Sequence, residues 1–343
     1  MDTPEEFKPN DSTPNNTFIS TDGIGIRSSM DDIVSCCSNK DNNCLSGHEK
    51  PGYLLCSYVK SFINTELGPV PVIKAELGKD DLFSTFYVRC GIRRNRYIVS
   101  PGLYAIGNPD KDSEVLVTAN FKLTFDMLRK ELDGISAWIL VLDTRGVNVW
   151  CAAGKGTFST RELVKRITDN HLEKIVNHKR VIVPQLGATG VSARDVKKQS
   201  RFRETYGPVR ASDIRAFINN DKKAEKQMRQ VTFTMYERFI LTPVEIQTIL
   251  KPALITAFIL LFLAGIGPGI FSFSSALQRG GVSILALAAG IFAGAFVTPV
   301  LLPFLPSRKF ALKGIIAGSI VALIPILFAA SAVNGKAGYL ALF

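Results

Sequence analysis

The C-terminal third of the chain carries no acidic side chain, and this feature restricts its fold more than any other. No Asp or Glu follows Glu245 in the 343 residues, and only six cations lie beyond it. Three apolar stretches lie there, each near the ~20 residues that cross the core of a bilayer. They are residues 252–271, 282–303 and 312–333. We predict three transmembrane helices, because three consecutive uncharged stretches are hard to bury in one soluble core.

The basic residues around these stretches predict an orientation. Arg308, Lys309 and Lys313 follow the second stretch, whereas the loops after the first and third are expected to carry Arg279 and Lys336. The positive-inside rule places the former group in the cytoplasm, and alternation places the N-terminal domain there too. The polar, acidic N-terminus does not resemble a signal peptide. We predict a multi-pass inner-membrane protein whose final AGYLALF opens a fourth, incomplete span.

The N-terminal segment has a different composition. Residues 1–52 are rich in Asp, Asn, Ser, Thr and Pro, and we predict a disordered tail. Cys36, Cys37, Cys44 and His48 are ligand types for a soft metal, but their spacing matches no common zinc pattern. A metal site and a tail with reduced cytosolic thiols both remain open.

The segment between tail and membrane alternates strand-like and helical patterns. Apolar runs alternating with amphipathic helices indicate a Rossmann-like α/β domain with a doubly wound parallel sheet, over residues 53–230. An all-α transmembrane domain, residues 231–343, follows it. The expected strands are 114–119, 137–142, 180–185 and 201–206, and the expected helices are 121–132, 161–167, 192–199 and 211–219.

Glycine-containing loops follow these strands, with the sequences TAN, DTRGVNVWC, LGATGVS and YGPVRAS. We expect them to converge on one rim, because ligands of such sheets bind beyond the carboxyl ends of the strands. The AAGKG segment is not a Walker A loop, since Gly146 lies eight positions before Gly154 and Gly156 follows Lys155. No dinucleotide fingerprint opens a helix after a strand, and Cys151 has no neighbouring Cys or His for zinc.

The NVWCAAGK stretch places a single thiol at the start of a short helix. Asn148 is suited to the N-cap position, which puts Cys151 in the first turn, where the partial positive charge of a helix N-terminus favours a thiolate. Gly154 and Gly156 should end this helix quickly. A lone buried cysteine is ordinarily a small apolar residue, so spacing alone leaves a structural role and a chemical role open.

These residues resemble a known family. NVWCAAGK is similar, at every position, to the cap-helix motif N-(V/I)-W-C-A-(A/S)-G-K of HgcA, the corrinoid protein family of microbial mercury methylation. The segments SPGLYAIGNP, VLVTANFK, AWILVLDTRG, VPQLGATGV and YGPVRASD resemble the corrinoid domain that this family shares with the large subunit of the corrinoid iron–sulfur protein. The similarity covers residues 68–220, and a fused membrane domain is a further likeness. The long cysteine-bearing tail and the early chain end depart from the family.

The resemblance implies a cofactor and a reaction. It implies a cobalamin-type corrinoid whose cobalt takes the Cys151 thiolate as its lower ligand, in a methyltransferase that passes a methyl group to Hg(II) and forms methylmercury. A soft, strongly donating thiolate favours departure of the methyl group with both bonding electrons, after which two electrons must restore the cobalt. A ferredoxin-like partner with 4Fe–4S clusters, HgcB, is the implied electron donor. The implied methyl donor belongs to one-carbon metabolism.

The resemblance also assigns the other site residues. Thr118 is expected near Cys151 as a second catalytic residue, with a hydrogen bond to its sulfur or to the edge of the corrin, and Trp150 is expected mainly to pack the cap helix onto the domain. Each assigned position has a structural alternative, such as a strand end or a strand–helix turn. The implied cofactor-binding residues are Asn148, Val149, Trp150, Cys151, Ala152, Ala153, Gly154, Lys155, Thr118, Asn120, Gly187, Ala188, Thr189, Gly190, Val191, Tyr206, Gly207, Pro208, Val209 and Arg210.

The charge of the chain bears on its partners. The net charge is +11, and Arg210, Arg215 and the basic segments 197–203 and 221–229 predict a basic face beside the membrane. This face could bind the ferredoxin-like partner or anionic lipid headgroups, or it could simply be solvated. Nucleic acid is disfavoured, because no basic motif interleaved with aromatic residues is present.

Two other functions stay open beside mercury methylation. One is a membrane-anchored corrinoid methyl carrier of the acetyl-CoA pathway, which the cysteine of the cap motif disfavours. The other is a membrane transporter or sensor whose α/β domain binds a ligand, which the scarcity of polar groups in the apolar stretches disfavours.

Overall fold

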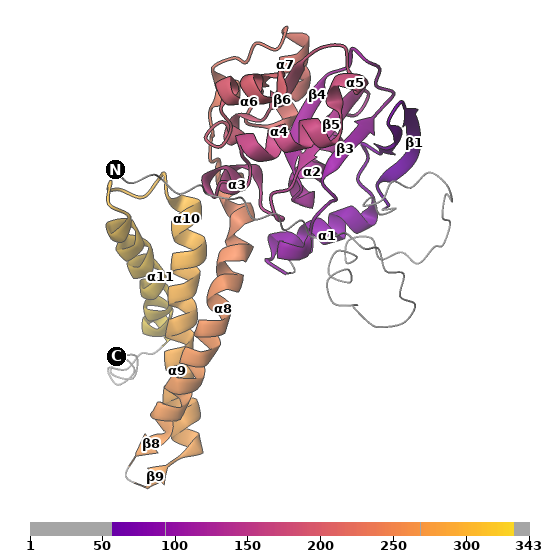
Figure 1. Cartoon of the computed structure of the whole chain (residues 1–343). Helices are drawn as coiled ribbons and strands as arrows, with labels where there is room; N and C mark the ends of the chain where they lie inside the picture. The colour runs from indigo at the N-terminus through magenta and orange to yellow at the C-terminus, as the bar shows by residue number, and fades with distance from the viewer. Residues whose placement is uncertain (1–56, 93, 268, 333–343) are drawn as a thin grey trace, which may run out of the picture.

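The computed structural model of the chain describes residues 57–92, 94–267 and 269–332. An α/β domain lies at one end of a set of long apolar helices (Figure 1). The predicted tail, with Cys36, Cys37, Cys44 and His48, lies outside the described residues, as does the AGYLALF segment.

The α/β domain is built on a seven-stranded sheet in the order β1-β2-β3-β5-β4-β6-β7. The pairs β4–β5, β4–β6 and β6–β7 are parallel, which confirms a parallel core formed by the four predicted strands. The sheet as a whole is mixed, contrary to the prediction, because β3 runs antiparallel to β5 and β1 forms a hairpin with β2. The strands are β1 Val59–Thr65, β2 Gly68–Ile73, β3 Gly102–Ile106, β4 Val115–Ala119, β5 Ala137–Leu142, β6 Arg180–Val183 and β7 Arg203–Tyr206.

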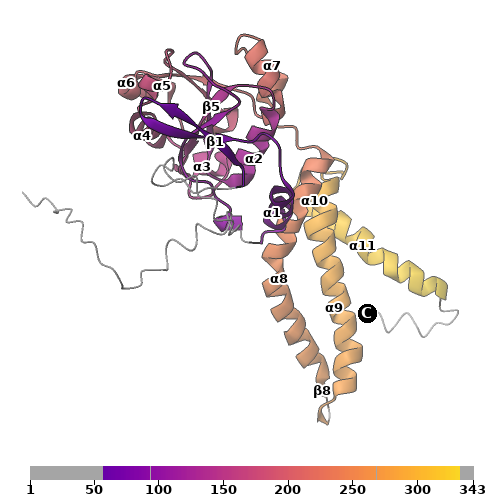
Figure 2. The same ribbon diagram turned by 90° about the vertical axis from the view of Figure 1, so that its right-hand side faces the viewer.

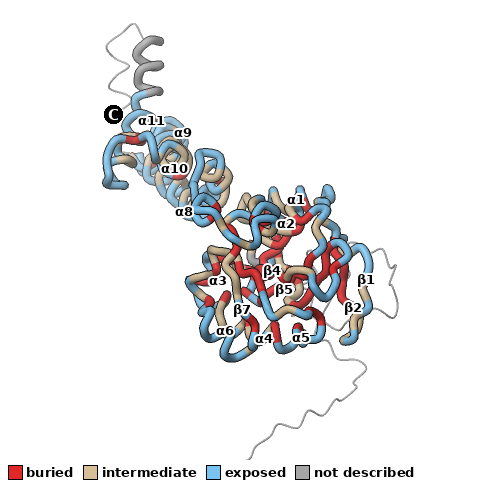
Figure 3. The backbone as a smooth tube through the Cα atoms, turned by 90° about the horizontal axis from the view of Figure 1, so that it is seen from above, coloured by how far each residue is buried: buried red, intermediate tan, exposed pale blue. Residues whose placement is uncertain are grey.

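Helices cover both faces of this sheet. One core contains residues of α3 to α6, packed under Phe158 and Phe202, and the other contains residues of α2 and α7. Strands β4 and β5 are buried along their whole length, as apolar strands with two covered faces must be (Figure 3). The helices are α1 Lys79–Arg89, α2 Lys122–Glu131, α3 Val149–Gly154, α4 Thr160–Asp169, α5 Leu172–Ile175, α6 Ala193–Ser200 and α7 Ile214–Asn219.

The C-terminal part consists of long helices. Thr234 starts α8 through a capping box. The Thr234 hydroxyl accepts from the Glu237 amide at 3.3 Å, and the Glu237 carboxylate accepts from the Thr234 amide at 2.7 Å. A π-helical turn, Ala293–Val297, joins α9 to α10. The elements are α8 Met235–Gly265, β8 Ile266–Gly267, β9 Ile270–Phe271, α9 Phe273–Phe292, α10 Thr298–Leu301 and α11 Phe310–Ala332.

By length and composition, two stretches of the described chain could cross a membrane, Met235–Gly265 and Phe273–Leu301. The buried share of their most apolar windows is 6% and 11%, so most of their apolar surface is uncovered in the described chain. Two predicted details are wrong. The first span does not run to residue 271, because the β8–β9 hairpin turns the chain after Gly265, and Arg279 lies inside α9 instead of in a loop.

The ends of the helices are arranged in a simple way. The β8–β9 hairpin lies at the end far from the α/β domain, and the loop between α10 and α11 lies at the near end (Figures 1 and 2). Arg308 and Lys309 belong to this loop, and the Lys313 ammonium donates to the Leu302 carbonyl at 2.6 Å. This arrangement agrees with the prediction that these cations and the α/β domain share one side.

Candidate functional site

The predicted cap helix is present as α3. The Asn148 side chain accepts a hydrogen bond from the Cys151 amide at 2.9 Å, which confirms the predicted N-cap. Val149, Ala152 and Ala153 face the core and are buried, whereas Cys151 is exposed. The helix therefore packs through one face and presents the thiol on the other.

Asn120 fixes the loop that leads to this helix. Its side-chain oxygen accepts from the amides of Thr144 and Gly146, both at 3.0 Å, and its side-chain nitrogen donates to Asp143 at 3.2 Å. Asn120 is 3% exposed and its side chain binds this loop, and its expected contact with a cofactor stays a prediction. It is a positioning residue for the cap helix.

An apolar cavity of about 300 Å³ lies beside α3 at the carboxyl edge of the sheet. Eight of the expected residues line it: Thr118, Asn148, Val149, Trp150, Gly207, Pro208, Val209 and Arg210. Sequence reasoning missed Met127 and Leu128 of α2 and Leu116 and Ile182 of the strands, which complete the apolar wall. The amphipathic pattern of α2 could have indicated that its apolar positions face this cavity.

Thr118 lies in the wall of this cavity. It is 2% exposed within β4 and lines the cavity, whereas Cys151 is not among the lining residues. Among the described contacts, no hydrogen bond joins the Thr118 hydroxyl to Cys151. The expected catalytic role of Thr118 stays a prediction.

Two glycines of the LGATG loop are required by packing. A Cβ atom at Gly187 would come within 2.5 Å of the Phe158 ring, and one at Gly190 within 2.0 Å of the Phe158 carbonyl oxygen. These glycines let the loop pack on the segment after α3. This packing gives them a structural role, and their expected role as a cofactor cradle stays a prediction. Val191 is buried, and its carbonyl accepts from the Tyr206 hydroxyl at 2.8 Å.

The remaining expected residues are distributed around the cap helix. Ala188 is half-buried and Thr189 is exposed, both outside the cavity lining, while Gly154 and Lys155 are exposed at the end of α3. The four loops nevertheless converge as predicted: Asn120 binds the loop after β5, and the Gln185 amide donates to the Pro208 carbonyl at 3.4 Å.

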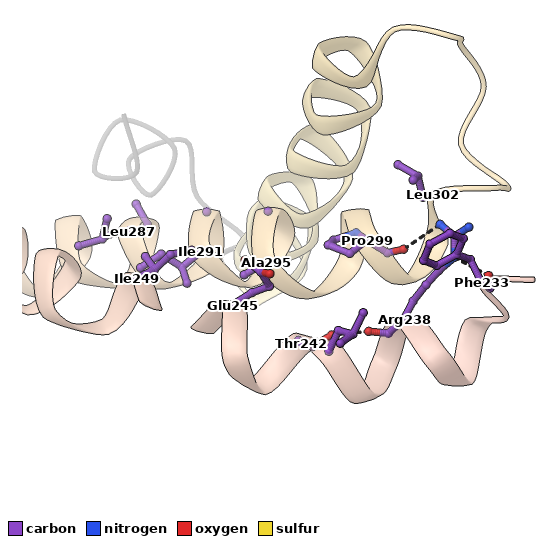
Figure 4. A pocket seen from close by; sticks show the side chains of 14 residues that line it. Phe233, Arg238, Thr242, Glu245, Ile249, Leu287, Ile291, Ala295, Pro299 and Leu302 are labelled. Atoms are coloured by element: carbon purple, nitrogen blue, oxygen red, sulfur yellow. Dashed lines mark hydrogen bonds between the residues drawn. The ribbon is translucent and has the colours of Figure 1, made fainter. Parts of the chain in front are cut away.

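The site also contacts the first long helix. The Arg210 guanidinium lies 2.6 Å from the Glu237 carboxylate, so the YGPVR loop is tied to the start of α8. The Trp150 and Phe233 rings lie 6.0 Å apart. Phe233 in turn lines a groove of about 840 Å³ between α8 and α9, where Arg238 donates to the Pro299 carbonyl at 3.5 Å (Figure 4). Aromatic contact therefore joins the cavity of the domain to the groove between the long helices.

Several cations of the predicted basic face have partners within the chain. Arg210 pairs with Glu237, Arg215 donates to the Asp133 carbonyl, and Lys222 pairs with Glu114 at 2.6 Å. The cations of residues 197–203 lie in the last turn of α6 and just after it, at the end of the domain far from the long helices (Figure 1). Because a helix that follows a parallel strand runs back along it, these cations return to the opposite edge of the sheet.

The described residues contain no cluster of three or more His, Cys, Asp or Glu that could hold a metal ion. Cys90 and Cys151 are free thiols of the described chain, half-buried and exposed respectively. Cys151 is thus suited to supply one ligand to a metal that arrives within a larger group, since a metal cage made by the protein would need several donors.

Comparisons with known proteins cover the α/β domain. Residues 92–218 match the family described as CO dehydrogenase/acetyl-CoA synthase delta subunit. The chain is 32% identical over 130 residues to the acetyl-CoA decarbonylase/synthase complex subunit gamma of Methanocaldococcus jannaschii, covering 37% of this chain and 26% of that protein. It is 38% identical over 124 residues to subunit gamma 2 of Methanosarcina thermophila, covering 34% and 25%.

A third relative is the gamma subunit of Archaeoglobus fulgidus, 30% identical over 125 residues, with 36% of this chain and 26% of that protein covered. The chain thus spans about a quarter of the length of the curated relatives it matches. The family match ends before α8. The α/β domain is similar to part of acetyl-CoA decarbonylase/synthase subunits. This similarity agrees better with the alternative of the acetyl-CoA pathway, which the cap motif disfavoured, than with mercury methylation, and the resemblance to HgcA stays a prediction.

Proposed function

We propose that this chain is a membrane-anchored corrinoid methyltransferase in which the Cys151 thiolate is the lower ligand of cobalt. One observation carries the proposal: Cys151 is exposed on a capped helix whose opposite face is buried. A structural cysteine would be expected on that buried face. The fixed helix instead holds the thiol outward, next to the cavity at the carboxyl edge of the sheet, where ligands of such folds bind.

The residues present fit a corrinoid. A cavity of about 300 Å³ is at the low end for ligand pockets, and its apolar wall would hold an aromatic side arm of a corrinoid next to α3. A bound corrinoid supplies a cobalt centre that can carry and release a methyl group. The chain contributes Cys151 as a donor, Asn148 and Asn120 to fix its position, and Thr118 as a polar group in the cavity wall.

We further propose Hg(II) as the methyl acceptor. A thiolate is a soft, electron-rich ligand, and it favours release of a methyl group with its bonding electrons to an electrophile such as Hg(II). This transfer requires an electron donor, for which a ferredoxin-like protein with 4Fe–4S clusters is suited, and a methyl donor from one-carbon metabolism. Helices α8 and α9 would anchor the chain in the inner membrane with the α/β domain in the cytoplasm.

A second candidate is a membrane-anchored corrinoid methyl carrier of the acetyl-CoA pathway. The comparisons favour it over mercury methylation, because the matched family and relatives are named for acetyl-CoA synthesis or cleavage. The exposed Cys151 favours mercury methylation. The two functions share the cofactor and differ in the methyl acceptor, so they can be separated by experiment.

The test compares Cys151→Ala with Cys90→Ala, which removes the other free thiol of the described chain. Since Cys151 is exposed, its removal should change the free energy of unfolding by no more than about 0.5 kcal/mol. We expect Cys151→Ala to change the absorption and EPR spectra of the cobalt and to abolish methylmercury formation from Hg(II). Cys90→Ala should leave both unchanged.

Two outcomes would contradict the proposal. A folded Cys151→Ala protein with the parent's spectrum and rate would show that the thiol is not the ligand. A parent protein that loads corrinoid and passes its methyl group to an acetyl-CoA synthase, but not to Hg(II), would favour the methyl carrier.

A further inference from the structure

Helix α1 presents its apolar side chains to the outside of the molecule. Leu82, Phe83, Phe86 and Tyr87 are 56%, 64%, 65% and 51% exposed. At this spacing they form one continuous stripe along the helix. The opposite face is buried and includes the carboxylate of Asp81. The polarity of α1 is therefore the reverse of that of a helix packed on a soluble domain.

Buried ion pairs hold α1 in this orientation. The Asp81 carboxylate lies 2.6 Å from the Lys122 ammonium and 2.7 Å from the Arg129 guanidinium, and both cations also bind Asp126. The Lys122 and Arg129 side chains are 3% and 0% exposed. Turning α1 to bury its aromatic side chains would strip both buried cations of a partner, which is strongly unfavourable. The apolar stripe is thus fixed facing outward.

The position of α1 along α8 is defined by a close contact. Gly91 follows α1 and packs on Gln247 of α8, where a Cβ atom at Gly91 would lie 2.8 Å from the Gln247 side-chain oxygen. Counting about 20 residues back from Gly265 puts the near membrane boundary at this same level of α8. Between Lys251 and Arg279 the chain carries no charged residue. Helix α1 runs crosswise to α8 in Figure 1 and is seen nearly end-on beside it in Figure 2.

We infer that α1 is an interfacial helix, whose stripe of Leu82, Phe83, Phe86 and Tyr87 lies in the boundary between lipid headgroups and acyl chains. The inference rests on the proposed membrane anchoring. Aromatic side chains concentrate at this depth, and a helix in the plane of the membrane inserts its apolar face into the same layer. Two exposed cations flank the stripe and suit anionic headgroups: Lys79 at the start of α1 and Arg96 in the turn that follows the helix. Together α1 and α8 hold the domain with its cap-helix edge toward the membrane.

The test uses the full chain in vesicles containing phosphatidylglycerol and lipids with brominated acyl chains, which quench tryptophan at known depths. Phe86→Trp and Leu82→Trp place a fluorophore in the stripe, and Lys198→Trp on exposed α6 is the matched control far from the long helices. We expect the added fluorescence of both α1 variants to be quenched severalfold more than that of the control, most strongly by shallow bromines.

Quenching of both α1 variants at the level of the control would overturn the inference and leave the stripe for a protein partner. Flotation of the vesicles after alkaline carbonate washing tests the anchoring separately. A chain that floats without quenching at Phe86→Trp and Leu82→Trp would refute the role of α1 while anchoring stands. A chain that is washed off would refute both.

Discussion

At the scale of single residues, the site depends on a side chain that touches no ligand. Asn120 directly follows β4, and its side-chain amide binds the loop that leads to Asn148 and Cys151. Nothing in the TAN sequence distinguishes an amide that binds a cofactor from one that binds a neighbouring loop. The distinction appears when β4 and β5 pair and bring residue 120 beside residues 143–146.

We predict that Asn120→Ala lowers the free energy of unfolding by about 3 kcal/mol, because it leaves two buried amides without an acceptor. Corrinoid binding should weaken with it, as α3 loses its fixed position. The control Asn148→Ala removes one N-cap hydrogen bond and should cost about 1 kcal/mol. Thermal unfolding followed by circular dichroism in detergent gives both values, and equal losses would contradict the positioning role.

At the scale of secondary-structure elements, α1 and α2 are joined by buried charges beside a small apolar cluster of Val88, Phe121 and Leu123. Burial by itself would raise the pKa of Asp81, but its hydrogen bond and charge interactions with Lys122 and Arg129 outweigh burial and lower it. Burial raises the pKa of Tyr97 to about 12, so its hydroxyl remains a neutral donor to Asp126 at 3.2 Å. Asp81 therefore stays ionised over the physiological range.

The sign of its pH dependence follows from the pKa of Asp81. Since the folded state holds the proton more weakly than the unfolded chain, the contribution of Asp81 is complete above its ordinary pKa of 3.8 and is lost as the pH falls through the lower, folded value. We predict a melting temperature that falls steeply below about pH 4 and less steeply in Asp81→Asn. The exposed pair Lys111–Glu66 provides the control, because Glu66→Gln should change the melting temperature little. Identical acid profiles for the parent and Asp81→Asn would contradict this account.

At the scale of the whole molecule, the two long stretches form an antiparallel pair closed by the β8–β9 hairpin. The α/β domain and the loop that carries Arg308 and Lys309 lie at one end, and the hairpin lies at the other (Figure 2). If α8 and α9 span a membrane, the two ends face different compartments.

We predict that a reporter fused after Arg308 lies in the cytoplasm and that one fused after Gly269, in the hairpin, lies outside. The cluster of cations before α11 should keep its own end inside. Compartment-specific enzyme reporters at the two positions provide the measurement. Equal signals from both fusions would show that the stretch Phe273–Leu301 does not cross the membrane.

The sequence determined the features that depend on neighbouring residues. The apolar runs of β4 and β5 predict buried parallel strands, and Asn148 predicts the cap of α3, because periodicity and capping act over a few positions. Strands β1 and β2 escaped this reading. The pattern VKSFINT of β1 alternates only weakly between apolar and polar residues. Pro69 and Pro71 interrupt GPVPVI of β2, and a proline is tolerated in a strand only where its missing N–H is not needed for a hydrogen bond to the neighbouring strand.

Tertiary structure alone decided which residues meet. Gly190 is needed because Phe158 packs on it, and Thr118 lines the cavity beside α3. Asp81 points inward because it forms ion pairs with Lys122 and Arg129. The order of strands and helices brings Phe158 to Gly190 and brings Lys122 and Arg129 to Asp81. The residues of each pair are separated by about 30 residues or more in the sequence. Local sequence fixes the preference of a segment, whereas contacts between distant segments depend on the whole packed chain, which no short pattern encodes.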